Sequence, residues 1–125
     1  VRCISPAAAA LTDPRLAEAF DQMWGRFPDP MVLVHRDRTI LAQNDAARAQ
    51  PWSAVGGKCH DANPAAEGHA CQGCQANAAM KQGTTIACEG ELGGKRIRGY
   101  WIPVKGESDV YVHGYTSLGA LPVVQ

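Results

Sequence analysis

Apolar side chains recur at intervals of three and four residues near the start of the chain. They are Leu16, Ala19, Phe20, Met23, Trp24 and Phe27. This spacing predicts an amphipathic helix that packs onto the rest of the domain or at a dimer interface. Thr12-Asp13-Pro14 is a helix-start signal, and Gly25 and Pro28 end the helix. We therefore expect a flanking helix within residues 12–28.

Short β-rich runs separated by turn residues occupy most of the remaining chain. The expected elements are strands at 31–35 and 39–43, helices at 46–50 and 72–82, and strands at 84–92, 95–105 and 110–118. Asn44-Asp45 caps the first helix, Gly83 ends the second, and Gly93-Gly94 is a hairpin signal. Two hairpin-joined groups of strands with helices between them predict an α+β domain with a five-stranded antiparallel sheet.

A long stretch without periodicity interrupts these elements. Residues 51–70 are rich in Gly, Pro, Asn and Asp. A loop of about 20 structureless residues is uncommon in a small domain and is usually functional. This loop holds Cys59 and His60 and leads into His69, Cys71 and Cys74.

Length and charge restrict the function classes. The chain has 125 residues, 46% of them hydrophobic and 19% charged, which fits a single globular domain. Twelve basic residues balance twelve acidic residues, which argues against a nucleic-acid partner. No apolar run is long enough to span a bilayer, and the N-terminus lacks the apolar core of a signal peptide, so we expect a cytoplasmic location. Residues 1–11 and 119–125 are expected to be linkers.

Five cysteines, an odd number, are clustered in a way that favours metal or redox chemistry over a disulfide framework. The spacing Cys59-x11-Cys71-x2-Cys74 supplies three thiolates, which suit zinc or an iron–sulfur centre. A tetrahedral zinc site needs a fourth ligand, and His69 is favoured over His60 and Cys88 because it lies two residues before Cys71. An iron–sulfur centre is less favoured, since it normally needs four cysteines.

Other interpretations of the cysteines stay open. Cys71 and Cys74 could form a thiol–disulfide switch or the redox pair of a small oxidoreductase, and all the cysteines could be structural. Gln75 follows the pair where covalent haem attachment needs histidine. Cys88 lies in phase with Ile86 on its strand and is expected to pack in the core. If a metal is bound, we predict that the three sulfurs of Cys59, Cys71 and Cys74 converge on one ion.

The order of elements resembles that of a PAS domain across residues 18–118. The segments in which we see this resemblance are Asp29-Pro30-Met31-Val32-Leu33-Val34, Thr39-Ile40-Leu41-Ala42-Gln43-Asn44-Asp45-Ala46-Ala47, Ile97-Arg98-Gly99-Tyr100-Trp101-Ile102-Pro103-Val104 and Tyr111-Val112-His113-Gly114-Tyr115-Thr116. Gly56-Gly57-Lys58-Cys59-His60 followed by Cys71-Gln72-Gly73-Cys74 is similar to a subset of bacterial signalling PAS domains.

The resemblance implies a sensor domain at residues 29–118 that is not an enzyme. It implies a five-stranded antiparallel sheet with helices on one side, a small ligand or cofactor held between them, and a homodimer joined to an output domain such as a kinase or transcription regulator. No flavin-type cysteine motif is present, and none of the four histidines is identified as a haem ligand. The alternatives are a small thiol–disulfide oxidoreductase and a metal-stapled dimerisation module.

Overall fold

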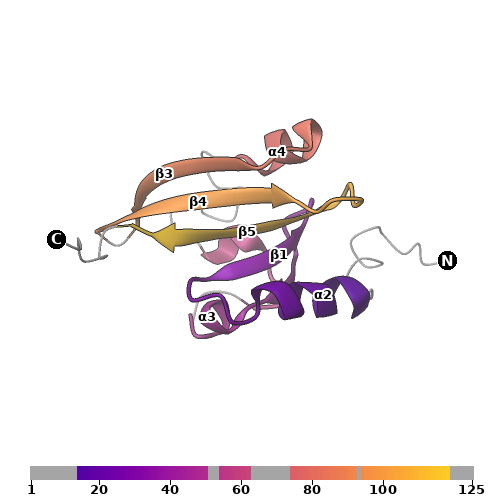
Figure 1. Cartoon of the computed structure of the whole chain (residues 1–125), viewed down its shortest axis with the longest axis horizontal. Coiled ribbons are helices and arrows are strands. Elements are labelled where there is room, and N and C mark those ends of the chain that lie inside the picture. The colour runs from indigo at the N-terminus through magenta and orange to yellow at the C-terminus, as the bar shows by residue number, and fades with distance from the viewer. Residues whose placement is uncertain (1–13, 51–53, 63–73, 93, 119–125) are drawn as a thin grey trace.

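Five strands form one antiparallel sheet in the order β2-β1-β5-β4-β3 (Figure 1). The structure, a computed structural model, describes residues 14–50, 54–62, 74–92 and 94–118. Its elements are α2 (Pro14–Trp24), β1 (Met31–His35), β2 (Ile40–Gln43), α3 (Asp45–Arg48), the 3-10 helix η1 (Cys59–Ala62), α4 (Ala76–Gln82), β3 (Ile86–Leu92), β4 (Lys95–Pro103) and β5 (Val110–Ser117). The predicted α+β class and five-stranded antiparallel sheet are confirmed.

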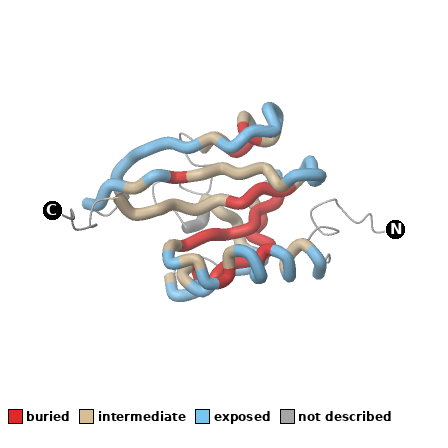
Figure 2. The backbone as a smooth tube through the Cα atoms, in the orientation of Figure 1, coloured by how far each residue is buried: buried red, intermediate tan, exposed pale blue. Residues whose placement is uncertain are grey.

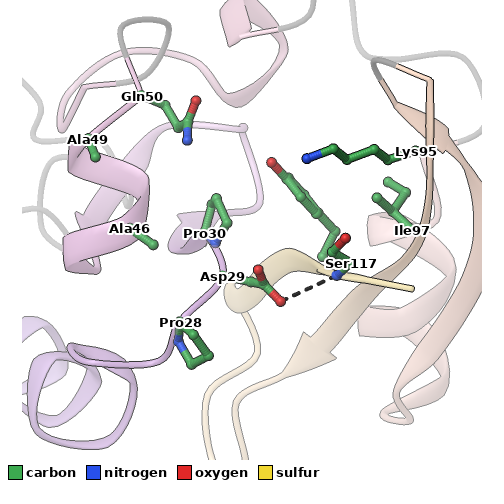
Figure 3. Close-up of a pocket in the computed structure, with 10 residues that line it drawn as sticks. Pro28, Asp29, Pro30, Ala46, Ala49, Gln50, Lys95, Ile97 and Ser117 are labelled. Atoms are coloured by element: carbon green, nitrogen blue, oxygen red, sulfur yellow. Dashed lines mark hydrogen bonds between the residues drawn. The ribbon is translucent and has the colours of Figure 1, made fainter. Parts of the chain in front are cut away.

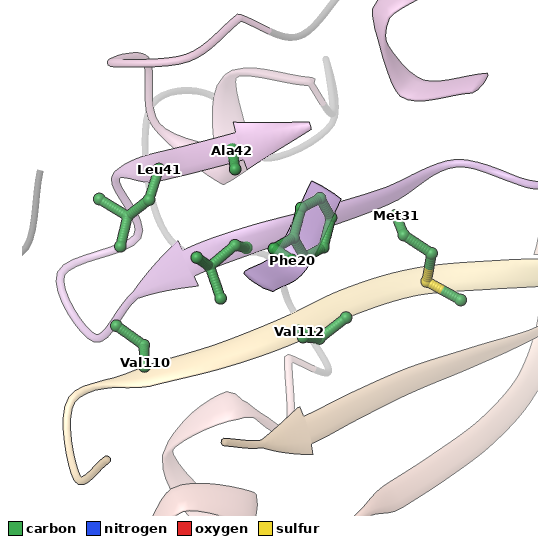
Figure 4. Close-up of a cluster of buried hydrophobic side chains, with 7 residues drawn as sticks. Phe20, Met31, Leu41, Ala42, Val110 and Val112 are labelled. Carbon is green, nitrogen blue, oxygen red and sulfur yellow. The ribbon is translucent and has the colours of Figure 1, made fainter. Parts of the chain in front are cut away.

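The sheet separates two apolar clusters, because side chains alternate between the faces of a strand. On the outer face, Phe20 of α2 packs with Met31, Leu33, Val110 and Val112 (Figure 4). On the inner face, side chains of the strands pack with residues of α3, η1 and α4. The buried residues of this inner-face cluster are Val32, Val34, Ile40, Ala47, Ala76 and Tyr111. The partly buried residues that pack against it are Cys59, Cys74, Met80 and Trp101. Every residue of β1 is buried, because the side chains of this strand point alternately into the two clusters (Figure 2).

Helix α2 packs onto the outer face of the sheet, as its apolar stripe predicts. Leu16, Phe20 and Trp24, spaced four apart, contact the outer cluster. Met23 is 80% exposed and Ala19 is also exposed. The face of α2 that packs on the sheet is therefore narrower than the predicted apolar stripe. The helix ends at Trp24, directly before Gly25. The capping residues 12 and 13 and the expected linkers 1–11 and 119–125 lie outside the described residues.

Part of the predicted loop 51–70 is ordered against the sheet. The Ile40 N–H donates to the Gly57 carbonyl at 2.8 Å, and the Gly56 N–H donates to the Ile40 carbonyl at 2.8 Å. The Cys59 N–H then donates to the Arg38 carbonyl at 2.7 Å. These bonds lay residues 56–59 along β2 and start η1, so the expectation of a structureless loop is wrong for this segment. Residues 51–53 and 63–70 are outside the description.

The remaining boundaries differ from the predictions by a few residues. Helix α4 begins at Ala76, two residues after Cys74, and β3 begins at Ile86, whereas a strand from residue 84 was expected. Gly83 ends α4 in the left-handed conformation with φ of 67°, as predicted. Leu92 pairs with Lys95 across the hairpin that the two glycines predict. None of the helices in the described ranges combines the length and hydropathy that crossing a bilayer requires.

Candidate functional site

Two of the three cysteines predicted to share a site lie against one cluster. Cys59 begins η1 and Cys74 precedes α4, and both are half-buried against the inner-face cluster. No local geometry forces this, because they are far apart along the chain. Cys71 and His69 lie outside the described residues, and the described residues alone contain no group of three or more metal-ligating side chains.

Cys88 departs from its predicted environment. Its phase is as expected, because Ile86 pairs with Trp101 and Cys88 pairs with Gly99 on the same face of the sheet. However, Cys88 is exposed, so the expected core packing is wrong. Its pairing partner Gly99 has no side chain to cover it, and β3 is an edge strand. No disulfide joins cysteines 59, 74 and 88.

An aromatic row crosses the inner face beside these cysteines. The rings of Trp101 and His113 are stacked, with centroids 5.0 Å apart and planes inclined by 22°. The rings of Tyr111 and His113 meet edge to face, with centroids 6.5 Å apart. The alternation of β5 could have indicated that Tyr111 and His113 share a face. Trp101 packs against the inner-face cluster and the adjacent Tyr100 packs against the outer one. No pattern in the sequence identified this row.

His113 is held as a neutral imidazole within the row. Its Nδ1 lies 2.8 Å from the Tyr100 carbonyl oxygen, and since a carbonyl only accepts, Nδ1 carries the proton. Burial lowers the pKa of His113, the Tyr100 bond opposes this in part, and the charge of Arg38 lowers it further. The imidazole therefore presents an unprotonated Nε2, which has no hydrogen-bond partner among the described residues.

Arg38 closes one end of the row from the β1–β2 turn. Its guanidinium carbon lies 5.8 Å from the centroid of the Tyr111 ring. One terminal nitrogen donates to the Arg36 carbonyl, and the other donates to Asn77 Oδ1 on α4 at 3.2 Å. Arg38 adopts a φ of 78°, the left-handed region that disfavours residues with a Cβ. No sequence pattern marks this turn position, so the role of Arg38 could not be predicted.

Two hydrogen-bond donors in this region are buried and have no partner among the described residues. They are Nε of Arg38 and Nε1 of Trp101. An unpaired buried donor costs about 1–3 kcal/mol, and most buried polar atoms in native proteins are satisfied.

The inner face continues along β5 into a pocket of about 340 Å³ (Figure 3). Its lining residues are Pro28, Asp29, Pro30, Ala46, Ala49, Gln50, Lys95, Ile97, Tyr115 and Ser117. Asp29 Oδ2 accepts a hydrogen bond from the Ser117 N–H at 3.3 Å. Burial, together with the charge of Asp29, raises the pKa of Tyr115. The pocket therefore has an acidic group, a phenol and the amine of Lys95 on its walls.

Gly99 lies between the pocket and the aromatic row. It precedes Trp101 by two residues on β4 and pairs with Tyr115 of β5. A methyl group built on Gly99 would lie no closer than 3.8 Å to its neighbours. The Trp101 ring lies within van der Waals distance of this position, so the indole covers Gly99.

Solved structures share this fold. A domain of an HTR-like protein from Haloarcula marismortui matches with a TM-score of 0.53 and 24% identity, over 73% of this chain and 98% of that chain. A sensory box sensor histidine kinase from Vibrio cholerae matches with a TM-score of 0.58 and 11% identity, over 94% and 99%. The PAS domain of Bordetella pertussis BvgS matches with a TM-score of 0.54 and 16% identity, over 85% and 88%.

These similarities establish the PAS fold that the residue pattern resembles. The identities are below 25%, so they concern the fold and not the ligand or the chemistry. No family model and no curated protein matches the sequence.

Proposed function

We propose that the chain is a sensory signalling domain whose inner face, between the sheet and η1 and α4, receives the signal. The PAS fold supports this, and one structural neighbour is described as a sensory box sensor histidine kinase. Binding or chemical modification on this face would alter how η1 and α4 pack on the sheet, and an attached domain would respond to the new packing. A homodimer, a cytoplasmic location and a kinase or transcription regulator as output domain belong to this proposal.

The signal centre that we propose is the cysteine cluster. The observation that carries it is the contact of both Cys59 and Cys74 with one inner-face cluster. Cys71, three residues before Cys74, and His69 would complete a tetrahedral zinc site. Thiolates bind zinc strongly, and a bound ion would fix a segment whose Gly, Pro and Asn content does not favour regular structure. Loss of the metal, or oxidation of its thiols, would then change the packing of η1 and α4.

The rival proposal is a thiol–disulfide oxidoreductase. Enzymes of the thioredoxin type place their Cys-x-x-Cys pair in a βαβ unit, whereas every strand pair in the described sheet is antiparallel. We therefore favour a sensor without catalytic turnover. Catalytic reduction of a disulfide substrate by the purified domain would contradict this choice.

The test is metal content after purification without oxygen. We expect one zinc per chain in the wild type and loss of zinc in Cys59→Ser and Cys74→Ser. Cys88→Ser is the matched control, because Cys88 is exposed on an edge strand. An absorption spectrum distinguishes zinc, which is colourless, from an iron–sulfur centre. A metal-free wild type, or zinc unaffected by Cys59→Ser, would contradict the metal proposal.

A further inference from the structure

We propose that the open edge of strand β3 is a dimer interface, at which β3 pairs antiparallel with β3 of a second copy and Cys88 lies on the twofold axis. This inference rests on the homodimer in the proposed function and names the surface that forms it. The two five-stranded sheets would join into one continuous sheet. The interface is separate from the cysteine centre, because Cys88 is not among the residues proposed to bind zinc.

The two edges of the sheet differ in how they are covered. The β2 edge lies beside residues 56–59, and Gly56 and Gly57 form hydrogen bonds with Ile40 there. On the β3 edge, residues 87–91 are exposed, and no described strand lies beyond them (Figure 1). Strand β3 has seven residues, contains no proline and pairs with β4 in one unbroken register. A regular, uncovered edge of this kind is a template for a further strand.

The backbone groups that this edge offers belong to alternate residues. The Leu118 N–H donates to the Arg96 carbonyl at 2.8 Å, so the even-numbered residues of β4 direct their backbone groups toward β5. The odd-numbered residues of β4 therefore bond to β3, and they pair with its even-numbered residues. It follows that the N–H and C=O groups of Ala87, Glu89 and Glu91 point away from the sheet, toward a partner strand.

The glutamates select one register for this pairing. If Glu89 lay on the twofold axis, it would face the partner's Glu89, and if the next residue lay there, it would face the partner's Glu91. Like charges directly opposite each other on a sheet are destabilising. With Cys88 on the axis, Ala87 faces the partner's Glu89 instead. Residues 86–90 of the two copies then overlap, which is the longest pairing of β3 with itself that opposes no two glutamates.

The same register suits the side chain at its centre. Because the backbone groups of Cys88 are used by β4, the two copies of Cys88 form a non-hydrogen-bonded pair, whose Cα atoms lie about 4.5 Å apart. A disulfide spans Cα separations of about 4.4–6.8 Å, so the two thiols lie within reach of a short cross-link. Cys88 is exposed and available for this contact in the single copy.

The dimer is expected to be weak. The pairing adds backbone hydrogen bonds at Ala87 and Glu89 but buries little apolar surface, and interfaces well below about 1,200 Å² are transient. Each Glu89 keeps its charge partner Arg98, which lies 3.1 Å away on β4. We therefore expect monomers in dilute solution and dimers at protein concentrations of about 0.1–1 mM.

The first experiment cross-links the concentrated, reduced protein with a bismaleimide short enough to join only adjacent thiols. Mass spectrometry of the digested dimer should identify Cys88 joined to the partner's Cys88. The control variant Cys88→Ser should lack this cross-link and still dimerise in sedimentation at the same concentration. A wild type that dimerises but is cross-linked only through other cysteines would overturn the interface and leave the proposed homodimer standing.

Two charge variants at one position test the register. Ala87→Glu places a carboxylate opposite the partner's Glu89 and should weaken the dimer about threefold or more. Ala87→Lys places an ammonium group there and should strengthen it by a similar factor. Position 87 is exposed, so both variants should melt near the wild-type temperature in dilute solution. Sedimentation equilibrium measures the dissociation constants, and equal constants for the two variants would overturn the register.

The same samples separate this inference from the proposed function. A monomer at every concentration up to about 1 mM would contradict both the edge pairing and the proposed homodimer. Zinc content does not depend on position 87, so it tests the cysteine centre independently. A dimer with equal constants in Ala87→Glu and Ala87→Lys forms through another surface, and then only the edge pairing is wrong.

Discussion

At the scale of single residues, Asn44 connects more of the structure than any neighbouring side chain. It is fully buried, and its Oδ1 accepts hydrogen bonds from the N–H groups of Met31 at 3.0 Å and Ala47 at 2.9 Å. Its Nδ2 donates to the carbonyls of Phe27 at 3.2 Å and Asp29 at 2.9 Å. One side chain therefore caps α3, anchors the start of β1 and fixes the segment between α2 and β1.

We predict that Asn44→Ala destabilises the domain by about 2–4 kcal/mol, because it removes a helix cap and leaves buried backbone groups unpaired. Asn44→Asp keeps the cap but points a carboxylate at two carbonyl oxygens, so it should also destabilise. Urea unfolding followed by circular dichroism measures both. A loss below about 0.5 kcal/mol for Asn44→Ala would contradict this account.

Asp37 makes the stability of the domain depend on acid pH. Burial disfavours its carboxylate, but hydrogen bonds from the Thr39 hydroxyl and N–H, a bond to His35 and the charge of Lys58 outweigh burial and lower its pKa from 3.8 to about 2. A lowered folded pKa adds stability that is complete above the unfolded value and is lost as pH falls through the folded value. This contribution is therefore lost between pH values of about 4 and 2.

We expect Asp37→Asn to cost about 1 kcal/mol at neutral pH, a value reduced for the partial exposure of the side chain. The variant should also lose less stability than the wild type between pH values of about 4 and 2. Denaturant midpoints across this range give the comparison. Asp109→Asn, which removes an exposed carboxylate paired with Arg36, is the control. Parallel pH profiles for Asp37→Asn and the wild type would refute the prediction.

At the scale of strands, the approach of β1 to β5 depends on Gly114. A Cβ at this position would overlap the Met31 sulfur and the Pro30 carbonyl oxygen. Gly114 pairs with Met31 in the register of the two strands, so relief of the overlap would require moving one strand away from the other. The close approach of β1 and β5 therefore requires glycine at position 114.

We predict that Gly114→Ala destabilises the domain by about 2 kcal/mol or more through this overlap. Gly90→Ala on β3 is the matched control, since a Cβ there meets nothing within 4 Å. Thermal unfolding should show a lower melting temperature for the first variant and little change for the second. Equal melting temperatures would show that Met31 and Pro30 move aside without cost.

The sequence predicted the elements whose signals are local. Asn44 as a cap and Gly83 as a helix end depend on neighbouring residues, and both were found where expected. Segment 56–59 was missed because most of its backbone hydrogen bonds are made with Arg38 and Ile40, which are distant in the sequence. The site around Arg38 was missed for the same reason, because a turn and two distant strands assemble it. The exposure of Cys88 depends on its position at the edge of the sheet.

At the scale of the whole molecule, burial decreases from β1 toward β3. All five residues of β1 are buried between two neighbouring strands, whereas β3 pairs only with β4 and is mostly exposed (Figure 2). Stability measured locally should follow this gradient, because segments with few buried contacts open without global unfolding.

We predict that the amides of β1 and β5 exchange with solvent deuterium only through global unfolding, while the amides of β3 bonded to β4 exchange at least about tenfold faster. Exchange followed residue by residue by nuclear magnetic resonance measures both sets under the same conditions. Comparable protection in β3 and β1 would mean that the edge strand opens only together with the whole sheet.

The strand order also has a consequence for how the domain is made in the cell. Strand β1 pairs with β2 on one side and with β5 on the other, where Met31 pairs with Gly114 and His35 pairs with Val110. A ribosome releases the chain in order, so β1 emerges with apolar side chains on both faces long before its partner exists. Closing so long a loop is slow, and the sheet cannot be completed until β5 has left the exit tunnel. The nascent β1–β2 hairpin is therefore the segment that we expect a chaperone to bind during synthesis.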